Sequence, residues 1–282
     1  MLRKARAVSD SLGNKSVDTI GLGAAYISPM RSRNTPTHRW PGLLLAAGLV
    51  AAPDALAIVN GTAVSDQRFA AEFGWAVALE YPGSDQVCTA TLIHPQWVLT
   101  AAHCVSPQLR VKLAHSSRAA ATALDAAGVY THPLYDAVTG AYDVGLVQLA
   151  QPAAPAPLPV ASAAEIDQVL RPNAPARILG WGRRSAGSSY SDRLIQSDLR
   201  LAALDREASR FAYEDRASGP CGGDSGGPLL LQRADGHWLL AGIASRVVGD
   251  ICAQGGGVGI YVDIGAAADF IRAHVPDRRG SL

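Results

Sequence analysis

The sequence is poor in charge and in paired cysteine motifs. Charged residues are 17% of its 282 residues and the formal net charge is +1, so no electrostatic argument favours nucleic acid or an anionic membrane surface as a partner. Its four cysteines include no Cys-x-x-Cys pair, which leaves a zinc site or a dithiol redox motif without support. Motifs for calcium, nucleotide or phosphate are also missing. We therefore expect no cofactor and no metal.

Long hydrophobic runs are missing as well, and the one apolar stretch near the N-terminus has a different meaning. The uncharged run 43–52 is shorter than the roughly 20 residues that span a bilayer. Arg31, Arg33 and Arg39 precede it, and Ala55-Leu56-Ala57 follows it. A basic flank, a short apolar core and an A-x-A site predict a secretory signal peptide; a buried helix is the alternative. We expect a secreted protein, extracellular or periplasmic, with no stable membrane span after signal removal.

The start of the chain does not fit this pattern. Residues 1–29 are mixed and polar, and Met30 is the only other methionine. A start at Met30 would give a signal peptide of ordinary length that ends at Ala57. We therefore predict that residues 1–57 are an N-terminal extension plus signal peptide, with Met30 as the true start. The excess of Arg over Lys, with abundant Ala, Gly and Pro, is typical of a GC-rich bacterial genome.

Four cysteines, Cys88, Cys104, Cys221 and Cys252, remain in the exported part of the chain. An even number of cysteines in an exported protein favours two disulfides, and the residues alone leave three connectivities open.

Past Ile58, short apolar segments alternate with turns rich in Gly, Pro, Asn and Asp. This spacing, without long helical periodicity, predicts an all-β sandwich or barrel. Four prolines in 151–164 exclude a central strand and predict an extended connector between two halves. The Ala-rich segment 265–275 has helical composition, with Phe270 and Ile271 as apolar anchors.

Three segments carry chemistry. The turn 222–228 places Ser225 among glycines, which permit tight backbone geometry and leave the hydroxyl accessible. By itself, a glycine-rich turn with a serine more often has only a structural role, because a serine nucleophile also needs a base and a group that orients the base. His103 stands beside Cys104, shortly after the apolar run 97–99, and Asp143 heads an otherwise apolar or uncharged strand. A carboxylate there is costly to bury unless hydrogen-bonded, and a histidine is a suitable partner. The chain order His, Asp, Ser is one that Ser-His-Asp triads adopt.

With these segments in place, the chain resembles the chymotrypsin/trypsin family of serine peptidases from Ile58 to about Val275. The resemblance rests on matches that occur in the family's order: Ile58-Val59-Asn60-Gly61, Cys88 and Cys104 with Trp97 between them, Gly180-Trp181-Gly182 and Gly259-Ile260-Tyr261-Val262. It implies two six-stranded antiparallel β-barrels with a short C-terminal helix. Residues 58–160 would form the first barrel, with His103 and Asp143, and residues 161–282 the second, with Ser225.

The resemblance also implies the role of each site residue. Ser225 is the nucleophile of a serine endopeptidase that works through an acyl-enzyme, His103 is its base, and Asp143 orients the base. The remaining roles are these: the backbone N–H groups of Gly223 and Ser225 form the oxyanion hole, Ser245 supports Asp143, the new α-amino group of Ile58 pairs with Asp224, and disulfides join Cys88 to Cys104 and Cys221 to Cys252. The A-x-A site abuts Ile58, so signal peptidase would itself create the active N-terminus.

The specificity pocket implied by the resemblance involves Gly219, Val247 and Gly259. Gly219 stands where trypsin-like enzymes have an aspartate, so cleavage after basic residues is not expected. Val247 occupies a wall position, and the step from Ser245 to Cys252 resembles that of elastases. We expect cleavage after small or medium aliphatic residues.

Two other function classes compete with an active peptidase. One is a catalytically inactive homologue that acts as an extracellular binding module, which the intact His103, Asp143 and Ser225 disfavour. The other, an α/β-hydrolase lipase or esterase, needs the order Ser, Asp, His on a strand–turn–helix elbow, which this chain lacks. The expected partners are protein or peptide substrates, with a protein inhibitor as a further candidate, and the expected state is a monomer.

Overall fold

The computed structural model describes residues 58–171, 173–205, 210–214, 218–249, 252 and 258–276. The predictions for residues 1–57, which include the signal peptide, lie outside the described residues. None of the helices in the described part is both long and apolar enough to cross a bilayer.

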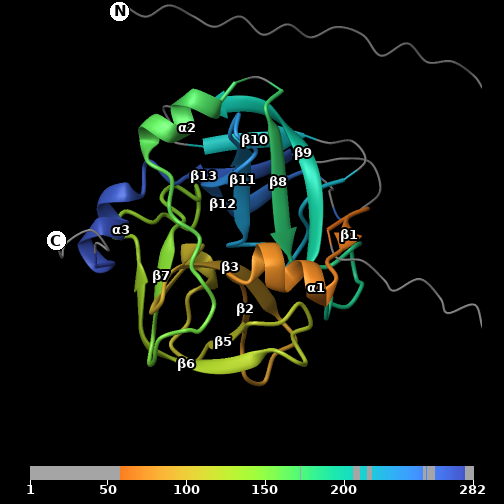
Figure 1. The fold of residues 1–282 in the computed structure, drawn as a ribbon, viewed down its shortest axis with the longest axis vertical. Coiled ribbons are helices and arrows are strands. Elements are labelled where there is room, and N and C mark those ends of the chain that lie inside the picture. Colours follow the sequence, from red (N-terminus) through yellow and green to blue (C-terminus); the bar gives the residue numbers. More distant parts are fainter. Residues whose placement is uncertain are drawn as a thin grey trace, which may run out of the picture. The chain divides into compact units, whose positions relative to one another are not determined.

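The first half of the described chain forms a closed barrel of six antiparallel strands (Figure 1). Their order is β2-β3-β4-β7-β6-β5, and β5 closes the barrel by pairing with β2, with Ala78 opposite Lys112. The strands are β2 (Ala76–Glu80), β3 (Val87–His94), β4 (Trp97–Thr100), β5 (Arg110–Leu113), β6 (Thr122–Thr131) and β7 (Gly145–Leu149). Residues in β2, β3 and β4 are almost all buried, as expected for strands rich in Val, Leu, Ile and Trp.

The second half contains six further antiparallel strands in the order β9-β10-β13-β12-β11-β8. Strand β8 also pairs with β9, at the other end of that order, and the short β1 (Thr62–Ala63) adds to β9. The six strands are β8 (Pro175–Gly180), β9 (Ile195–Asp205), β10 (Arg210–Glu214), β11 (Pro228–Gln232), β12 (Trp238–Val248) and β13 (Val258–Asp263). The predicted fold, two six-stranded antiparallel sets of the chymotrypsin type, is confirmed. The boundaries 58–160 and 161–282 stay predictions.

The helices are short. Figure 1 shows α2 (Ala163–Val169) and α3 (Ala268–His274) outside the strands, while α1 (Asp66–Arg68) runs into a π-helical turn, Phe69–Phe73. Helix α3 lies within the predicted segment 265–275, and its expected anchors Phe270 and Ile271 are buried.

Helix α2 was not expected, although its capping signal is in the sequence. The Ser162 side chain accepts a hydrogen bond from the Glu165 backbone, and the Glu165 side chain accepts one from the Ser162 N–H at 2.9 Å. This reciprocal pair is a capping box, which satisfies two helix-terminal donors. The proline-rich connector therefore ends in a helix rather than running extended to Ala164.

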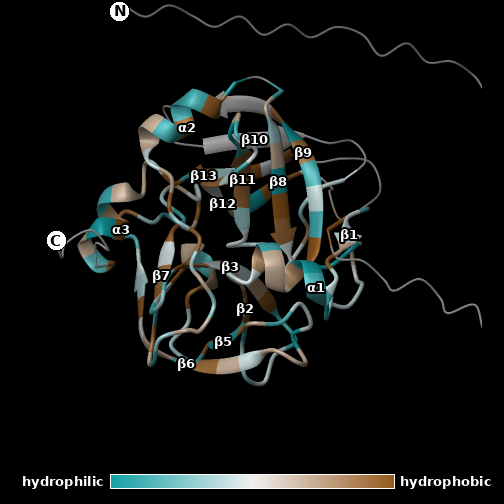
Figure 2. Ribbon diagram, in the orientation of Figure 1, coloured by the Kyte–Doolittle hydropathy of each residue, from teal (hydrophilic) through white to brown (hydrophobic). Residues whose placement is uncertain are grey.

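Hydrophobic residues concentrate along the strands of both halves, as the brown segments of Figure 2 show. Leu79, Leu92, Leu99 and Leu146 in the first barrel are at most 1% exposed. Their burial holds the strands in register, because a slip of one residue would turn these side chains to the opposite face. The ends of these strands therefore have fixed positions for the side chains that follow them.

Ala114, just after β5, offers a test of backbone strain. It is exposed and has φ 68°, a left-handed conformation that costs a non-glycine residue about 1–2 kcal/mol. We expect Ala114→Gly to raise the free energy of unfolding by about 1 kcal/mol and the thermal midpoint by about 2–4 °C, measured by calorimetry. Ala119 is the control: it is exposed without a positive φ, so Ala119→Gly should lower the midpoint. A lower midpoint for Ala114→Gly would contradict the argument.

Candidate active site

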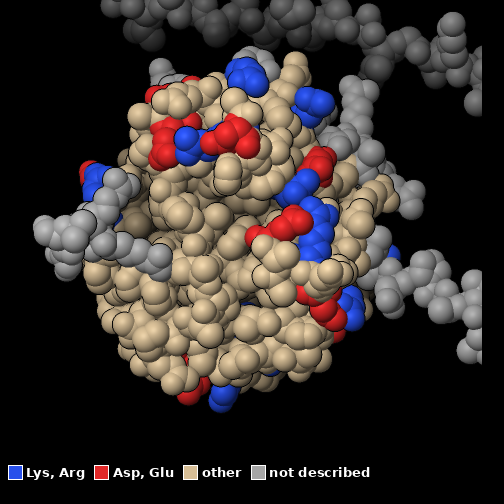
Figure 3. All heavy atoms as spheres, viewed as in Figure 1, with Lys and Arg blue, Asp and Glu red and all other residues tan. Residues whose placement is uncertain are grey.

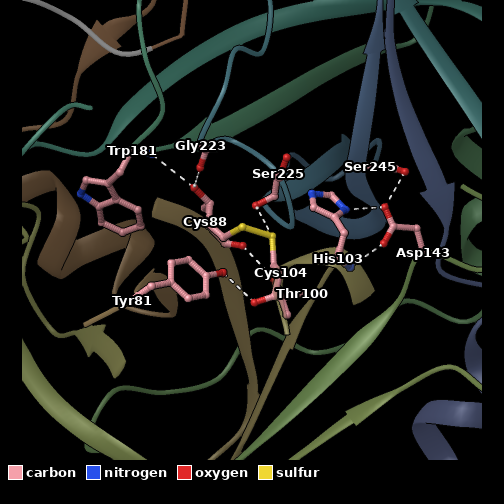
Figure 4. Close-up of a disulfide and its surroundings, with 11 residues drawn as sticks. Tyr81, Cys88, Thr100, His103, Cys104, Asp143, Trp181, Gly223, Ser225 and Ser245 are labelled. Atoms are coloured by element: carbon pink, nitrogen blue, oxygen red, sulfur yellow. Dashed lines mark hydrogen bonds and ion pairs between the residues drawn. A yellow bond between two sulfur atoms is a disulfide. The ribbon is translucent and has the colours of Figure 1, made fainter. Parts of the chain in front are cut away.

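Three chain segments meet at the junction of the two halves. His103 lies in a short 3₁₀ turn (Ala102–Cys104) directly after β4, and Asp143 lies just before β7. Because β4 pairs with β7, with Thr100 opposite Gly145, these two side chains leave the barrel close together. Ser225 lies in the turn before β11. Figure 4 shows the imidazole of His103 between Ser225 and Asp143.

Asp143 is 2% exposed and accepts three hydrogen bonds. His103 Nδ1 is 2.7 Å from Oδ2, the His103 backbone N–H donates to Oδ1 at 3.0 Å, and the Ser245 hydroxyl donates to Oδ2 at 2.7 Å. Burial opposes ionisation of this carboxyl, but the hydrogen bonds and the charge of His103 outweigh it and hold the pKa of Asp143 below its usual value. Asp143 is thus a carboxylate that orients the ring of His103.

The orientation of His103 leaves one ring nitrogen free for chemistry. A carboxylate only accepts hydrogen bonds, so Nδ1 carries the hydrogen toward Asp143, and in the neutral ring Nε2 is then an acceptor. The side chain is 34% exposed, which makes Nε2 reachable from outside. Such a ring can take a proton from a neighbouring hydroxyl.

The turn that carries Ser225 is held by the buried Thr89 of the first barrel, which is itself bonded by the buried Thr100. The Thr89 N–H donates to the Ser225 carbonyl at 2.8 Å, and the Thr89 hydroxyl donates to the Gly223 carbonyl at 3.0 Å. The Thr100 hydroxyl donates to the Thr89 carbonyl at 3.0 Å. Sequence reasoning missed both threonines, and the only available signal was a hydroxyl in strands that are otherwise apolar. They fix the serine turn against the barrel that carries His103.

Gly223 needs to be glycine at this turn. Its φ is 99°, and a Cβ there would lie 2.8 Å from the Gly182 Cα and 2.7 Å from the Tyr190 ring. Among the described residues, no acceptor takes a hydrogen bond from the backbone N–H of Gly223 or of Ser225. Two N–H donors beside the serine are thus available to a negatively charged oxygen.

Asp224 is buried between these two residues without a cationic partner in the described part of the chain. Its carboxyl oxygens accept hydrogen bonds at 2.9 Å from the N–H groups of Gly182 and Cys221. Burial raises its pKa to about 7 in spite of these bonds. Ile58 is also fully buried, and its neighbour Val59 pairs with Gly219.

The raised pKa of Asp224 predicts a pH-dependent stability for the chain that retains residues before Ile58. Between about pH 4 and pH 7 the folded chain holds a proton that the unfolded chain has lost, because the ordinary pKa is 3.8. The contribution of Asp224 to the free energy of unfolding is therefore fully present below about pH 4. It is lost as the pH rises to about 7, which lowers the free energy of unfolding by up to about 4 kcal/mol. Urea unfolding at pH 5 and pH 8 measures the larger part of this fall, about 3 kcal/mol. Asp224→Asn, which does not titrate, should lack this component, and an equal pH dependence of both chains would contradict the assignment.

The structure contains two disulfides, Cys88–Cys104 and Cys221–Cys252. The first joins β3 to the turn that carries His103, and the Tyr81 hydroxyl donates to the Cys104 carbonyl at 2.6 Å (Figure 4). Cys88, Cys104 and His103 also place metal-ligand atoms near one another, but both sulfurs are consumed in the disulfide and are not thiolates. The bonds therefore brace the site.

A small hollow lies beside Ser225. Its volume is about 20 Å³, which is room for about one water molecule. Its described lining residues are Pro220, Cys221, Ser225, Ala244, Ser245, Arg246, Val247, Ile260 and Tyr261. Gly219 and Gly259 are not among them, although a Cβ at Gly259 would lie 3.0 Å from Pro220 and Tyr261 side-chain atoms.

The site and the fold together define a class: a two-barrel β protein in which a buried carboxylate orients an exposed imidazole near a serine. A model of the family described as Trypsin matches residues 58–271, and the chain belongs to this family of serine peptidases. The predicted family is thus confirmed.

Individual relatives agree with the family match. The chain is 30% identical to "Proproteinase E" of Bos taurus over 67% of this chain and 83% of that protein. It is 29% identical to "Trypsin" of Saccharopolyspora erythraea over 71% of this chain and 92% of that protein. It is also 30% identical to "Transmembrane protease serine 9" of Rattus norvegicus over 71% of this chain, but spans only 21% of the rat protein.

Proposed function

We propose that this chain is a secreted serine endopeptidase with Ser225 as nucleophile, His103 as general base and Asp143 as the group that orients the base. The observation that carries the proposal is the buried Asp143 carboxylate, 2.7 Å from His103 Nδ1. Figure 4 draws the imidazole between Asp143 and Ser225, and Cys104, the residue after His103, contacts the Ser225 carbonyl at 3.6 Å. Two disulfides and membership of the trypsin family support an extracellular protein.

The proposed reaction follows from these positions. The Ser225 hydroxyl attacks the scissile carbonyl while His103 Nε2 takes its proton, and Asp143 stabilises the imidazolium. The free N–H groups of Gly223 and Ser225 stabilise the oxyanion, a contribution worth about 10²–10³ in rate for one such donor. The intermediate collapses, the amine leaves with the proton from His103, and water then hydrolyses the acyl-enzyme by the same steps.

The hollow of about 20 Å³ beside Ser225 supports a small residue before the scissile bond, which is the small end of the proposed preference for small or medium aliphatic residues. Val247 lines the hollow, and Gly219 brings no charge to pair with Lys or Arg. One methylene group in such a pocket is worth about 1–3 kcal/mol, so the preference is graded rather than absolute. Gly219, Val247 and Gly259 stay the predicted pocket positions.

Strand β12 supports an extended mode of substrate binding. Beyond Ile243 it no longer pairs with β11, and Arg246 and Val247 pair only with β13 among the described strands. The other edge of this segment is therefore open beside Ser225. A peptide can add to such an edge through main-chain hydrogen bonds, which supply affinity without fixing the side chains.

The alternative, an inactive homologue that binds other proteins, is not favoured, because the candidate nucleophile, base and orienting carboxylate are all present. Four further parts of the proposal rest on the sequence alone. They are cleavage by signal peptidase before Ile58, a bacterial origin, binding by a protein inhibitor, and a monomeric state.

A fluorophosphonate probe tests the proposal directly. The chain that begins at Ile58 should be labelled covalently at Ser225, because only a serine activated by a base reacts quickly with this reagent. Ser225→Ala should not be labelled. Ser189→Ala, which changes an exposed serine, should be labelled like the unmodified chain. A folded, unmodified chain that resists the probe would favour the inactive binding module.

A further inference from the structure

Arg246 places a positive charge at the edge of the candidate active site. It follows Ser245, whose hydroxyl binds Asp143, and it lines the same hollow as Ser225 and Val247. Its side chain crosses to the other half of the molecule, where a Cβ built on Gly140 would lie 3.0 Å from Arg246 Cζ and Nη2. The guanidinium thus rests against the chain segment that leads into Asp143.

This guanidinium has no anionic partner among the described residues. Asp143 is occupied by His103 and Ser245, and Asp136, in the same segment as Gly140, turns back to accept from the N–H groups of Val138 and Thr139. Arg246 is half-buried and makes no ion pair or hydrogen bond with another described side chain. A partly desolvated guanidinium with five unused donors is a strong site for a carboxylate.

The position of Arg246 fixes which carboxylate can reach it. Arg246 lies on the open edge of β12, next to Val247 in the hollow. Since each residue of an extended peptide advances about 3.3 Å, a peptide bound along this edge brings the side chains of roughly three consecutive residues within reach of the guanidinium.

We propose that Arg246 is a specificity-determining residue that binds an Asp or Glu side chain of the peptide substrate within about three residues of the scissile bond. The inference rests on the proposed peptidase function and adds to it a substrate class, acidic peptides. Val247 and the small hollow select an aliphatic residue at the bond itself, while Arg246 selects a negative charge nearby. An arginine suits this task because its planar fork binds both carboxylate oxygens.

Matched peptides test the inference. All peptides are blocked at both ends and have Ala directly before the scissile bond. In each pair, one of the three peptide positions next to this Ala that would lie along β12 carries either Glu or Gln. We expect the unmodified enzyme to cleave the best Glu peptide about 10-fold faster than its Gln partner in kcat/KM. This ratio should fall in 1 M salt, which screens charges beyond about 3 Å.

Three variants separate charge from shape. Arg246→Gln should bring the Glu-to-Gln ratio to about one, and Arg246→Lys should keep part of the preference for Glu. For Arg246→Glu we expect a reversed charge preference: a third peptide, with Lys in place of Glu, should become the best substrate. The charge reversal is decisive, because a general loss of folding does not create a new preference.

The outcomes distinguish the inference from the proposed function. Fluorophosphonate labelling is measured on each preparation. In one outcome the unmodified enzyme is labelled yet cleaves the Glu and Gln peptides at equal rates, and in another Arg246→Glu leaves their ratio unchanged. Either result would overturn the role of Arg246 and leave the peptidase proposal standing. If the unmodified enzyme is not labelled and cleaves none of the peptides, the peptidase proposal itself would be overturned.

Discussion

Ser225→Ala is expected to lower kcat for peptide hydrolysis by about 10⁶-fold, and His103→Ala by about the same factor. The double variant should be no slower than either single one, because a nucleophile without its base, or a base without its nucleophile, contributes almost nothing. Asp143→Asn should cost about 10⁴-fold, since an amide no longer holds His103 in the tautomer with Nε2 free. Initial rates on a chromogenic peptide with Ala before the scissile bond measure all four.

The control for these variants is His237→Ala, which changes an exposed histidine outside the candidate site and should leave kcat within about two-fold. Circular dichroism establishes that each variant is folded. A multiplicative loss in the double variant, or losses that appear in KM and not in kcat, would contradict the assignment of Ser225, His103 and Asp143 to one catalytic unit.

The second large effect concerns the N-terminus. A chain that begins at Ile58 with a free α-amino group should exceed the same chain with an added Met by about 10²–10³-fold in kcat/KM. Asp224 is buried with its pKa raised to about 7, and no cation among the described residues pairs with it, so its charge is costly in the extended chain. An ammonium group at Ile58 would neutralise it, and a buried charge that loses its partner costs about 3–5 kcal/mol. Because Asp224 lies between Gly223 and Ser225, the pair would also order the two N–H donors.

Mass spectrometry of each preparation establishes which residue comes first. The matched control is a chain that begins at Ile58→Val with a free amino group, which should keep most of the activity, whereas chemical acetylation of the free Ile58 amine should reproduce the loss. Asp224→Asn should make the two chain starts equally active. If the Met-extended chain were as active as the chain that starts at Ile58, the activation mechanism would be wrong.

Much of the fold was predictable from local patterns. Short apolar segments bounded by Gly, Pro and Asp became strands β2, β4 and β7, and the Ala-rich segment near the end became α3, although it begins at Ala268 rather than Gly265. Two features of the fold go beyond what the sequence analysis predicted, each for a physical reason. Helix α2 forms because the Ser162–Glu165 capping box offsets the preceding prolines. Strand β12 runs on to Val248 because β13 continues to pair with it after β11 has ended.

The sequence indicated the members of the candidate site, whose catalytic roles stay predictions, but it did not indicate the residues that hold them in place. Ser225, His103 and Asp143 stand in segments whose residue types and order point to nucleophile, base and orienting group. Thr89 lies far from Ser225 in the sequence, and nothing in its local pattern indicates that its N–H binds the Ser225 carbonyl at 2.8 Å. Such a contact depends on how the two halves pack.

The sequence by itself determined which side chains are available for the proposed chemistry, because a hydroxyl, an imidazole and a carboxylate follow from residue identity. Only the tertiary structure decided what lies around the site: Asp224 is buried with no cationic partner among the described residues, the hollow beside Ser225 measures about 20 Å³, and the Arg246 guanidinium lies against Gly140. Burial, free volume and the partner of a charge depend on segments distant in the chain that folding brings together, and no local pattern encodes that proximity.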